Sequence, residues 1–146
     1  MIAVTLKLDP IIDLTDEQFY KLCQLNRDIR LERSAGGELI VMPPTCGETG
    51  NRNIKLAARL ENWAEKDGTG VAFDSSTGFK LPNGANRSPD AAWVRLDRWR
   101  ALFRQQRTSF PPLVPDFVVE LRSATDSLKP LQEKMQEYID NGVRLG

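Results

Sequence analysis

The amino-acid sequence predicts an α/β domain with a mixed central sheet flanked by helices. An apolar run over residues 115–122 is bounded by a proline and by a Ser/Thr/Asp cluster, which is typical of a buried strand. Helical apolar spacings alternate with short strand-like runs elsewhere in the chain. The 146 residues are 40% hydrophobic and 27% charged, which suits one domain with its own core. We therefore expect a single domain over residues 1–146.

The N-terminal half predicts two helices and a hairpin. Thr15, with Gln18 three residues later, has the spacing of a capping box and predicts the start of the first helix. Two alternating runs are joined by glycines at positions 36 and 37, as a hairpin turn requires. Gly68 predicts the end of the second helix. In order, we expect an edge strand at 4–8, a helix at 15–26, strands at 29–34 and 38–42, and a polar loop at 45–51 that opens a helix running to about residue 66.

The C-terminal half predicts shorter strands, a central strand and a final helix. Pro130 is tolerated in the first turn of that helix, and Asn141 with Gly142 predicts its end. In order, we expect strands at 70–74, 78–81 and 90–94, a helix at 96–103, the central strand at 115–122 and a helix at 127–141.

The composition excludes several kinds of chemistry. The chain has no histidine, so Ser-His-Asp and Cys-His hydrolases and His-ligated zinc sites are excluded. Cys23 and Cys46 are far apart and form no CxxC motif, which argues against a zinc site and a disulfide framework. No apolar run is long enough to cross a membrane, and no signal peptide is evident, so we expect a cytoplasmic protein. Twenty basic and twenty acidic residues balance, so any contact with nucleic acid must be local.

Glu120 is out of place in the predicted central strand. A buried carboxylate costs several kcal/mol unless it is paired or bound to a cation. One interpretation is an ion pair with Arg122, which lies two residues later on the same face of the strand. The other is a metal site shared with a second acid.

Spacing selects the second acid. Asp116 lies on the same strand as Glu120, with the Cα atoms about 13 Å apart, which is too far for the two to share one Mg²⁺ readily. Asp90 begins a different strand, and neighbouring strands run about 4.8 Å apart. Two carboxylates on the same face of adjacent strands can share a divalent cation, whose bound water is a nucleophile toward a phosphodiester. A two-carboxylate glycoside hydrolase also fits the acid pair, although the basic segment gives it no support.

Three further features have both structural and functional interpretations. Glu48, at the start of the second helix, is favoured there by the helix macrodipole alone. Lys134 borders the apolar stripe of the final helix, where a lysine commonly extends toward water. The segment from residue 95 to residue 107 contains five arginines and one acid, Asp97. It forms either a solvated surface or a surface that contacts phosphates.

Four sequence blocks, taken in order, resemble the Uma family of restriction endonucleases, within the PD-(D/E)xK nuclease superfamily. They are the strand at 37–44 leading into a helix, Arg87-Ser88-Pro89-Asp90, the run at 115–120, and the segment from Lys134 to Tyr138 followed by Asn141-Gly142-Val143. The resemblance implies a restriction-endonuclease-like fold and an endonuclease that requires Mg²⁺ or Mn²⁺ and hydrolyses DNA. It also implies that Asp90 and Glu120 ligate the metal and that Glu48 is an auxiliary acid.

The chain departs from the superfamily pattern at several positions. Arg122 stands where the pattern has lysine. An arginine side chain stays protonated and cannot act as a base, but its planar guanidinium suits a phosphate charge. We expect Lys134 to supply the missing amine and to orient or deprotonate the attacking water. The histidine that many members carry near the first core helix is absent.

The C-terminal end also departs from the family pattern. Residues 141–146 are similar to the entry of a strand that relatives continue, so we expect a truncated C-terminal end. An unpaired sheet edge would then permit a homodimer. The alternative to an enzyme is a noncatalytic, nuclease-like binding or structural domain, in which Glu120 pairs with Arg122 and no metal binds.

Overall fold

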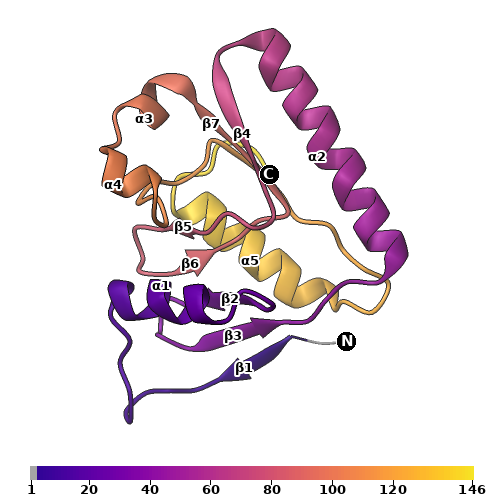
Figure 1. Ribbon diagram of the computed structural model, residues 1–146. Coiled ribbons are helices and arrows are strands. Elements are labelled where there is room, and N and C mark those ends of the chain that lie inside the picture. The colour runs from indigo at the N-terminus through magenta and orange to yellow at the C-terminus, as the bar shows by residue number, and fades with distance from the viewer. Residues whose placement is uncertain (1–2) are drawn as a thin grey trace.

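A computed structural model describes residues 3–146, and within them the strands divide between two sheets (Figure 1). One sheet has five strands in the order β1-β3-β2-β6-β5, and the other has three in the order β4-β7-β8. All the strand pairs described in these sheets are antiparallel, and an isolated parallel bridge joins Phe117 to Leu145. The predicted α/β class with flanking helices is confirmed, although two sheets stand where one central sheet was expected.

The N-terminal elements form the lower layer of the molecule as drawn in Figure 1. Helix α1 follows the predicted capping box, with Thr15 accepting from the Gln18 amide and Gln18 accepting from that of Thr15. The hairpin is present and pairs Arg33 with Leu39. The elements are β1 (Val4–Leu6), α1 (Asp16–Leu25), β2 (Arg30–Arg33) and β3 (Leu39–Met42).

Helix α2 (Gly47–Asp67) is the longest helix described and packs against the three-stranded sheet. It ends where the sequence predicted, because Gly68 adopts a left-handed backbone with φ of 72° and its amide donates to Ala64. The next strand, β4 (Gly70–Asp74), pairs with β7 (Ala91–Arg95). A Cβ at Gly70 would lie 2.1 Å from the Trp93 ring, so only glycine lets the indole cross the strand there.

The remaining elements are short, except for the final helix. They are β5 (Phe79–Lys80), β6 (Asn86–Arg87), α3 (Leu96–Arg100), α4 (Arg104–Arg107), β8 (Phe117–Val119) and α5 (Leu128–Asp140). The predicted helix at 96–103 ends early, and a second short helix follows it. Strand β6 was not predicted, because two polar residues show no apolar alternation.

Helix α5 crosses the middle of the molecule in Figure 1 and contributes to the main core. Tyr138 of this helix is fully buried beside Val118 of β8 and Val94 of β7. Among the residues that the structure describes, none of the helices combines the length and apolar character needed to cross a bilayer.

Candidate active site

Asp90 and Glu120 lie close together at the ends of neighbouring strands. The β7–β8 ladder pairs Ala92 with Val118 and ends with Ala91 opposite Val119; one further step would set Asp90 against Glu120, and the bond from the Leu121 amide to Asp90 at 2.6 Å agrees with this placement. Opposite residues of an antiparallel pair project to the same face, with Cα atoms about 4.5–5.5 Å apart. The two acids that spacing selected are therefore neighbours.

The central strand is shorter than predicted, and the reason lies in Asp90. Strand β8 ends at Val119, so Glu120 lies just beyond it. The Leu121 amide donates to the Asp90 carboxylate at 2.6 Å. In a longer strand this backbone amide would instead donate to a carbonyl of the neighbouring strand. The expectation of a strand through residue 122 was wrong.

Arg122 does not reach Glu120. Its side chain is exposed, and its Nε donates to the Asp126 carbonyl at 3.2 Å. No ion pair between Glu120 and Arg122 occurs within residues 3–146, so the predicted pairing of the noncatalytic alternative is absent. The physical reason is the early end of β8: beyond it, the alternation that put both side chains on one face no longer holds.

Helix α5 supplies the partners of Glu120 instead. Lys134 Nζ lies 2.8 Å from Glu120 Oε1, and the Tyr138 hydroxyl donates to the same oxygen at 2.9 Å. Residues four apart share one face of a helix, so Lys134 and Tyr138 approach the carboxylate together. Lys134 thus points into the protein, rather than toward water.

Sequence reasoning missed Glu32, the most buried acid of the site. Its side chain on β2 is 2% exposed, and it accepts from Lys134 Nζ at 2.8 Å, Arg87 Nη1 at 3.2 Å and the Ser88 amide at 2.9 Å. We interpreted residues 29–34 as a hairpin strand, in which a glutamate ordinarily faces solvent. A signal was present in Leu31-Glu32-Arg33, because each face of that strand carries a charge and neither is purely apolar.

The charges around Glu120 are incompletely balanced. Burial raises the pKa of Glu120 above its ordinary value; Lys134 opposes this shift, and the charges of Glu32 and Asp90 add to it. For Glu32, burial also raises the pKa, but Lys134 and Arg87 outweigh burial and leave the pKa lowered. Burial acts to lower the pKa of Lys134, but the two carboxylates raise it overall, so the amine stays protonated.

The charges around Glu120 include more acids than bases. Four carboxylates and three cations lie together in a set that we call the acid–base cluster. Its members are Glu32, Asp90, Glu120 and Glu137 against Arg30, Arg87 and Lys134. The uncompensated negative charge lies on the Asp90–Glu120 side. Glu32 contacts two cations, whereas Glu120 shares Lys134 with Glu32, and Asp90 has only Arg30 at 3.8 Å.

The Asp90–Glu120 pair fits a divalent cation. Mg²⁺ is commonly held by one or two carboxylates and keeps several waters. Both side chains are only slightly exposed, and the excess negative charge favours a cation beside them. Within residues 3–146 no group of three or more acids, cysteines or histidines is arranged to hold a metal, so such a site would use these two acids and water.

Glu48 lies outside the acid–base cluster. Its side chain is 76% exposed in the first turn of α2, and Oε1 accepts from Arg52 at 2.8 Å. No hydrogen bond or ion pair in the described part of the chain links it to the cluster. The helix macrodipole and the i,i+4 pair explain its position.

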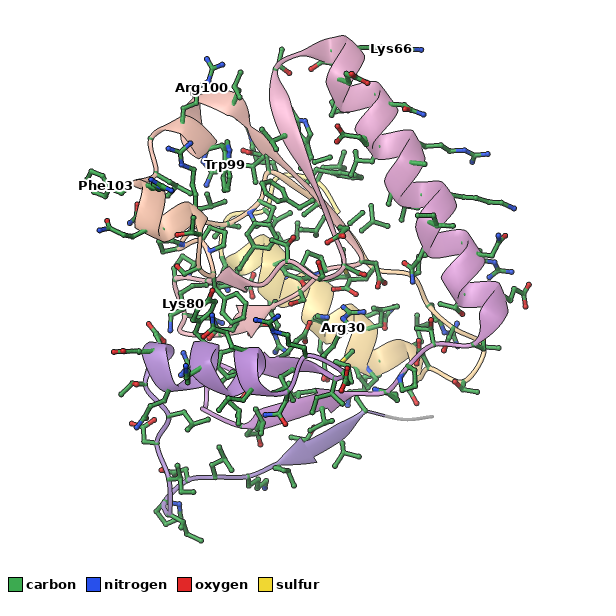
Figure 2. All side chains as sticks on the ribbon, in the orientation of Figure 1. Arg30, Lys66, Lys80, Trp99, Arg100 and Phe103 are labelled. Atoms are coloured by element: carbon green, nitrogen blue, oxygen red, sulfur yellow. The ribbon has the colours of Figure 1, made fainter. Side chains whose placement is uncertain are left out.

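The basic segment at 95–107 lies at the far end of β7 from Asp90. Arg95 and Arg98 are engaged with Asp97 and Asp116, at 2.7 Å and 2.9 Å. Arg100 and Arg104 are exposed, and Figure 2 shows Arg100 at the outline of the molecule.

Comparisons with known proteins identify the family and the fold. A family model, Uma2, described as "Putative restriction endonuclease", matches residues 16–146. A crystal structure of a putative nuclease belonging to DUF820 from Anabaena variabilis is similar, with a TM-score of 0.70 and 16% identity. The similarity covers 89% of this chain and 70% of that one. No match was found among curated proteins.

Proposed function

The chain belongs to the Uma2 family, as its four sequence blocks indicated, and from that premise we propose that it is a divalent-metal-dependent endonuclease that hydrolyses DNA phosphodiester bonds. The observation that carries the proposal is the contact at 2.8 Å between Lys134 and Glu120, with Asp90 opposite in register. A divalent cation held by the acid pair would activate a bound water toward a phosphate, and the adjacent ammonium can orient that water.

Each residue of the proposed mechanism has a distinct task. Asp90 and Glu120 would hold Mg²⁺ or Mn²⁺, which supplies a Lewis acid and lowers the pKa of a bound water. Lys134 lies beside Glu120 and, as an ammonium, orients the attacking water rather than deprotonating it, while Glu32 and Tyr138 hold Lys134 and Glu120 in place. Arg122 and Glu48 lie outside the cluster, so the proposal does not depend on them.

A cleavage assay tests the proposal. Supercoiled plasmid is incubated with Mg²⁺ or Mn²⁺ and wild-type protein, Asp90→Asn or Glu120→Gln. We expect cleavage by the wild type and a loss of about 100-fold or more in both variants, because each removes a charge from the metal pair. Glu133→Gln, an exposed acid on α5, is the control and should cleave normally. Equal activity in the wild type and Asp90→Asn would end the proposal.

A noncatalytic, nuclease-like binding domain is the second candidate, and one observation favours it. Lys134 already neutralises part of the charge that a metal would use, since its Nζ lies 2.8 Å from both Glu32 and Glu120. Calorimetric titration with Mn²⁺ separates the two functions. Binding that disappears in Asp90→Asn supports the enzyme, and no binding by the wild type supports the second candidate.

We also propose that the basic segment contacts DNA phosphates. Arg100 and Arg104 are exposed, and no ion pair is described for either in residues 3–146. Replacing both with serine should lower the salt dependence of DNA binding, with the slope of log K against log salt falling by about 1.8. Replacing two exposed cations of the α1 region, Lys21 and Arg27, should leave the slope unchanged. An unchanged slope in the Arg100/Arg104 variant would remove this surface from the DNA-binding site.

A further inference from the structure

Arg30 lies at the edge of the acid pair, although no sequence pattern pointed to it. It is the first residue of β2, and its Nη2 donates to the Ser88 carbonyl at 2.8 Å. Its Nη1 lies 3.8 Å from Asp90 Oδ1. The guanidinium is therefore anchored to the backbone of the segment that leads into Asp90. Figure 2 shows Arg30 in the interior of the view, whereas Arg100 and Phe103 lie at its outline.

The donors of Arg30 are largely unused. A guanidinium has five N–H groups, and one normal hydrogen bond is described for this one. The separation from Asp90 exceeds hydrogen-bonding distance, so the contact is electrostatic only. Nε is buried and has no partner in the described part of the chain. Buried donors in proteins are nearly always paired, so Arg30 is incompletely satisfied; because Nε is covered, a ligand would meet the remaining N–H groups of Nη1 and Nη2.

The other two cations of the acid–base cluster are already engaged. Lys134 bridges Glu32 and Glu120, and Arg87 bridges Glu32 and Glu137. Their side chains are 14% and 13% exposed, whereas that of Arg30 is 32% exposed. Arg30 is therefore the cluster cation that combines open donors with access from solvent, within residues 3–146.

We propose that Arg30 binds the DNA phosphate at the Asp90–Glu120 pair, the task that the sequence assigned to Arg122. The planar fork of a guanidinium matches two phosphate oxygens, and the charge offsets the repulsion between the phosphate and Asp90. Arg30 thus brings the phosphate to the acids that would hold the metal. This inference rests on the proposed function for the identity of the ligand, but its geometry is independent of cleavage.

The test measures DNA binding separately from cleavage. A fluorescently labelled duplex is titrated in EDTA and in Ca²⁺ with the wild type, Arg30→Gln and Arg30→Lys. Glutamine keeps a donor for the Ser88 carbonyl, which favours correct folding, and removes the charge. We expect Arg30→Gln to bind about tenfold more weakly and to lower the salt slope by about 0.9. Arg30→Lys keeps the charge and should retain the wild-type slope.

Two controls make the result specific. Arg27→Gln removes an exposed charge just before β2 and should bind DNA normally. Arg30→Gln should still bind Mn²⁺, since both acids remain, which a collapsed site would not do. Binding of DNA by Arg30→Gln within twofold of the wild type, with an unchanged slope, would overturn the inference. A wild type that binds DNA through Arg30 but never cleaves it would instead refute the proposed function and leave this inference standing.

Discussion

Replacing Lys134 with methionine is the most informative single change in the acid–base cluster. The ammonium lies 2.8 Å from both Glu32 and Glu120, and its removal leaves four carboxylates facing two cations. Glu32 keeps Arg87 and the Ser88 amide, but Glu120 keeps only the Tyr138 hydroxyl among the partners described. Methionine fills a similar volume, so the change tests charge rather than packing.

The structure sets the size of the expected effect. Removing one partner of a buried ion pair costs about 3–5 kcal/mol, because the remaining charge is left buried without compensation. For a chain of this length, such a loss lowers Tm by on the order of 10 °C. Adding Glu120→Gln to the same protein removes the uncompensated charge, so the double variant should regain part of that loss.

Urea unfolding at pH 7, followed by tryptophan fluorescence, measures these differences. Lys129→Met is the matched control, because Lys129 lies on the same helix, is exposed and makes only a distant pair with Glu133 at 3.9 Å. Its expected cost is below about 1 kcal/mol. Equal midpoints for Lys134→Met and Lys129→Met would refute the electrostatic account of the cluster. A double variant no more stable than Lys134→Met would show that Glu120 is not the charge left unpaired.

Three further predictions concern parts of the molecule outside the cluster. Gly70→Ala should lower the free energy of unfolding by about 1–3 kcal/mol, because the new Cβ would meet the Trp93 ring; an unchanged urea midpoint would contradict this. Cys46 is exposed, and a hydrogen bond from Thr49 lowers its pKa, so Cys46 should account for the fast phase when the protein is labelled with a thiol-specific reagent. The Cys46→Ser variant should lack that phase. The hydrogen bond from Lys80 lowers the pKa of Asp16, so its stabilisation is present above the ordinary value of 3.8 and is lost as pH falls through the lowered value. Asp16→Asn should therefore reduce the loss of unfolding free energy on acidification. The difference should be less than about 1 kcal/mol because the carboxylate is mostly exposed.

Local signals in the sequence predicted most helix boundaries. The Thr15 capping box and Gly68 act through bonds within a few residues, so no distant partner was needed to recognise them. The hairpin turn at Gly36 and Gly37 is local in the same way. The end of β8 was misplaced because it depends on a bond to Asp90, thirty-one residues from Leu121.

The site was only partly predictable, for a similar reason. Asp90 and Glu120 were found because a carboxylate within an apolar run is conspicuous, and Lys134 because it borders an apolar helical stripe. Glu32 was overlooked, since a glutamate in a short hairpin strand is ordinarily solvated, and its burial depends on Lys134, 102 residues away.

By itself, the sequence determined the α/β class, the main helices, the family and the two acids proposed to bind a metal, Asp90 and Glu120. Tertiary structure alone decided which charges meet: Glu32 rather than Glu48 belongs to the acid–base cluster, and Arg30 rather than Arg122 lies at the acid pair. Helix caps and turns are governed by neighbours in the chain, whereas the pairing of buried charges is governed by which strands and helices pack together, and that depends on the whole fold.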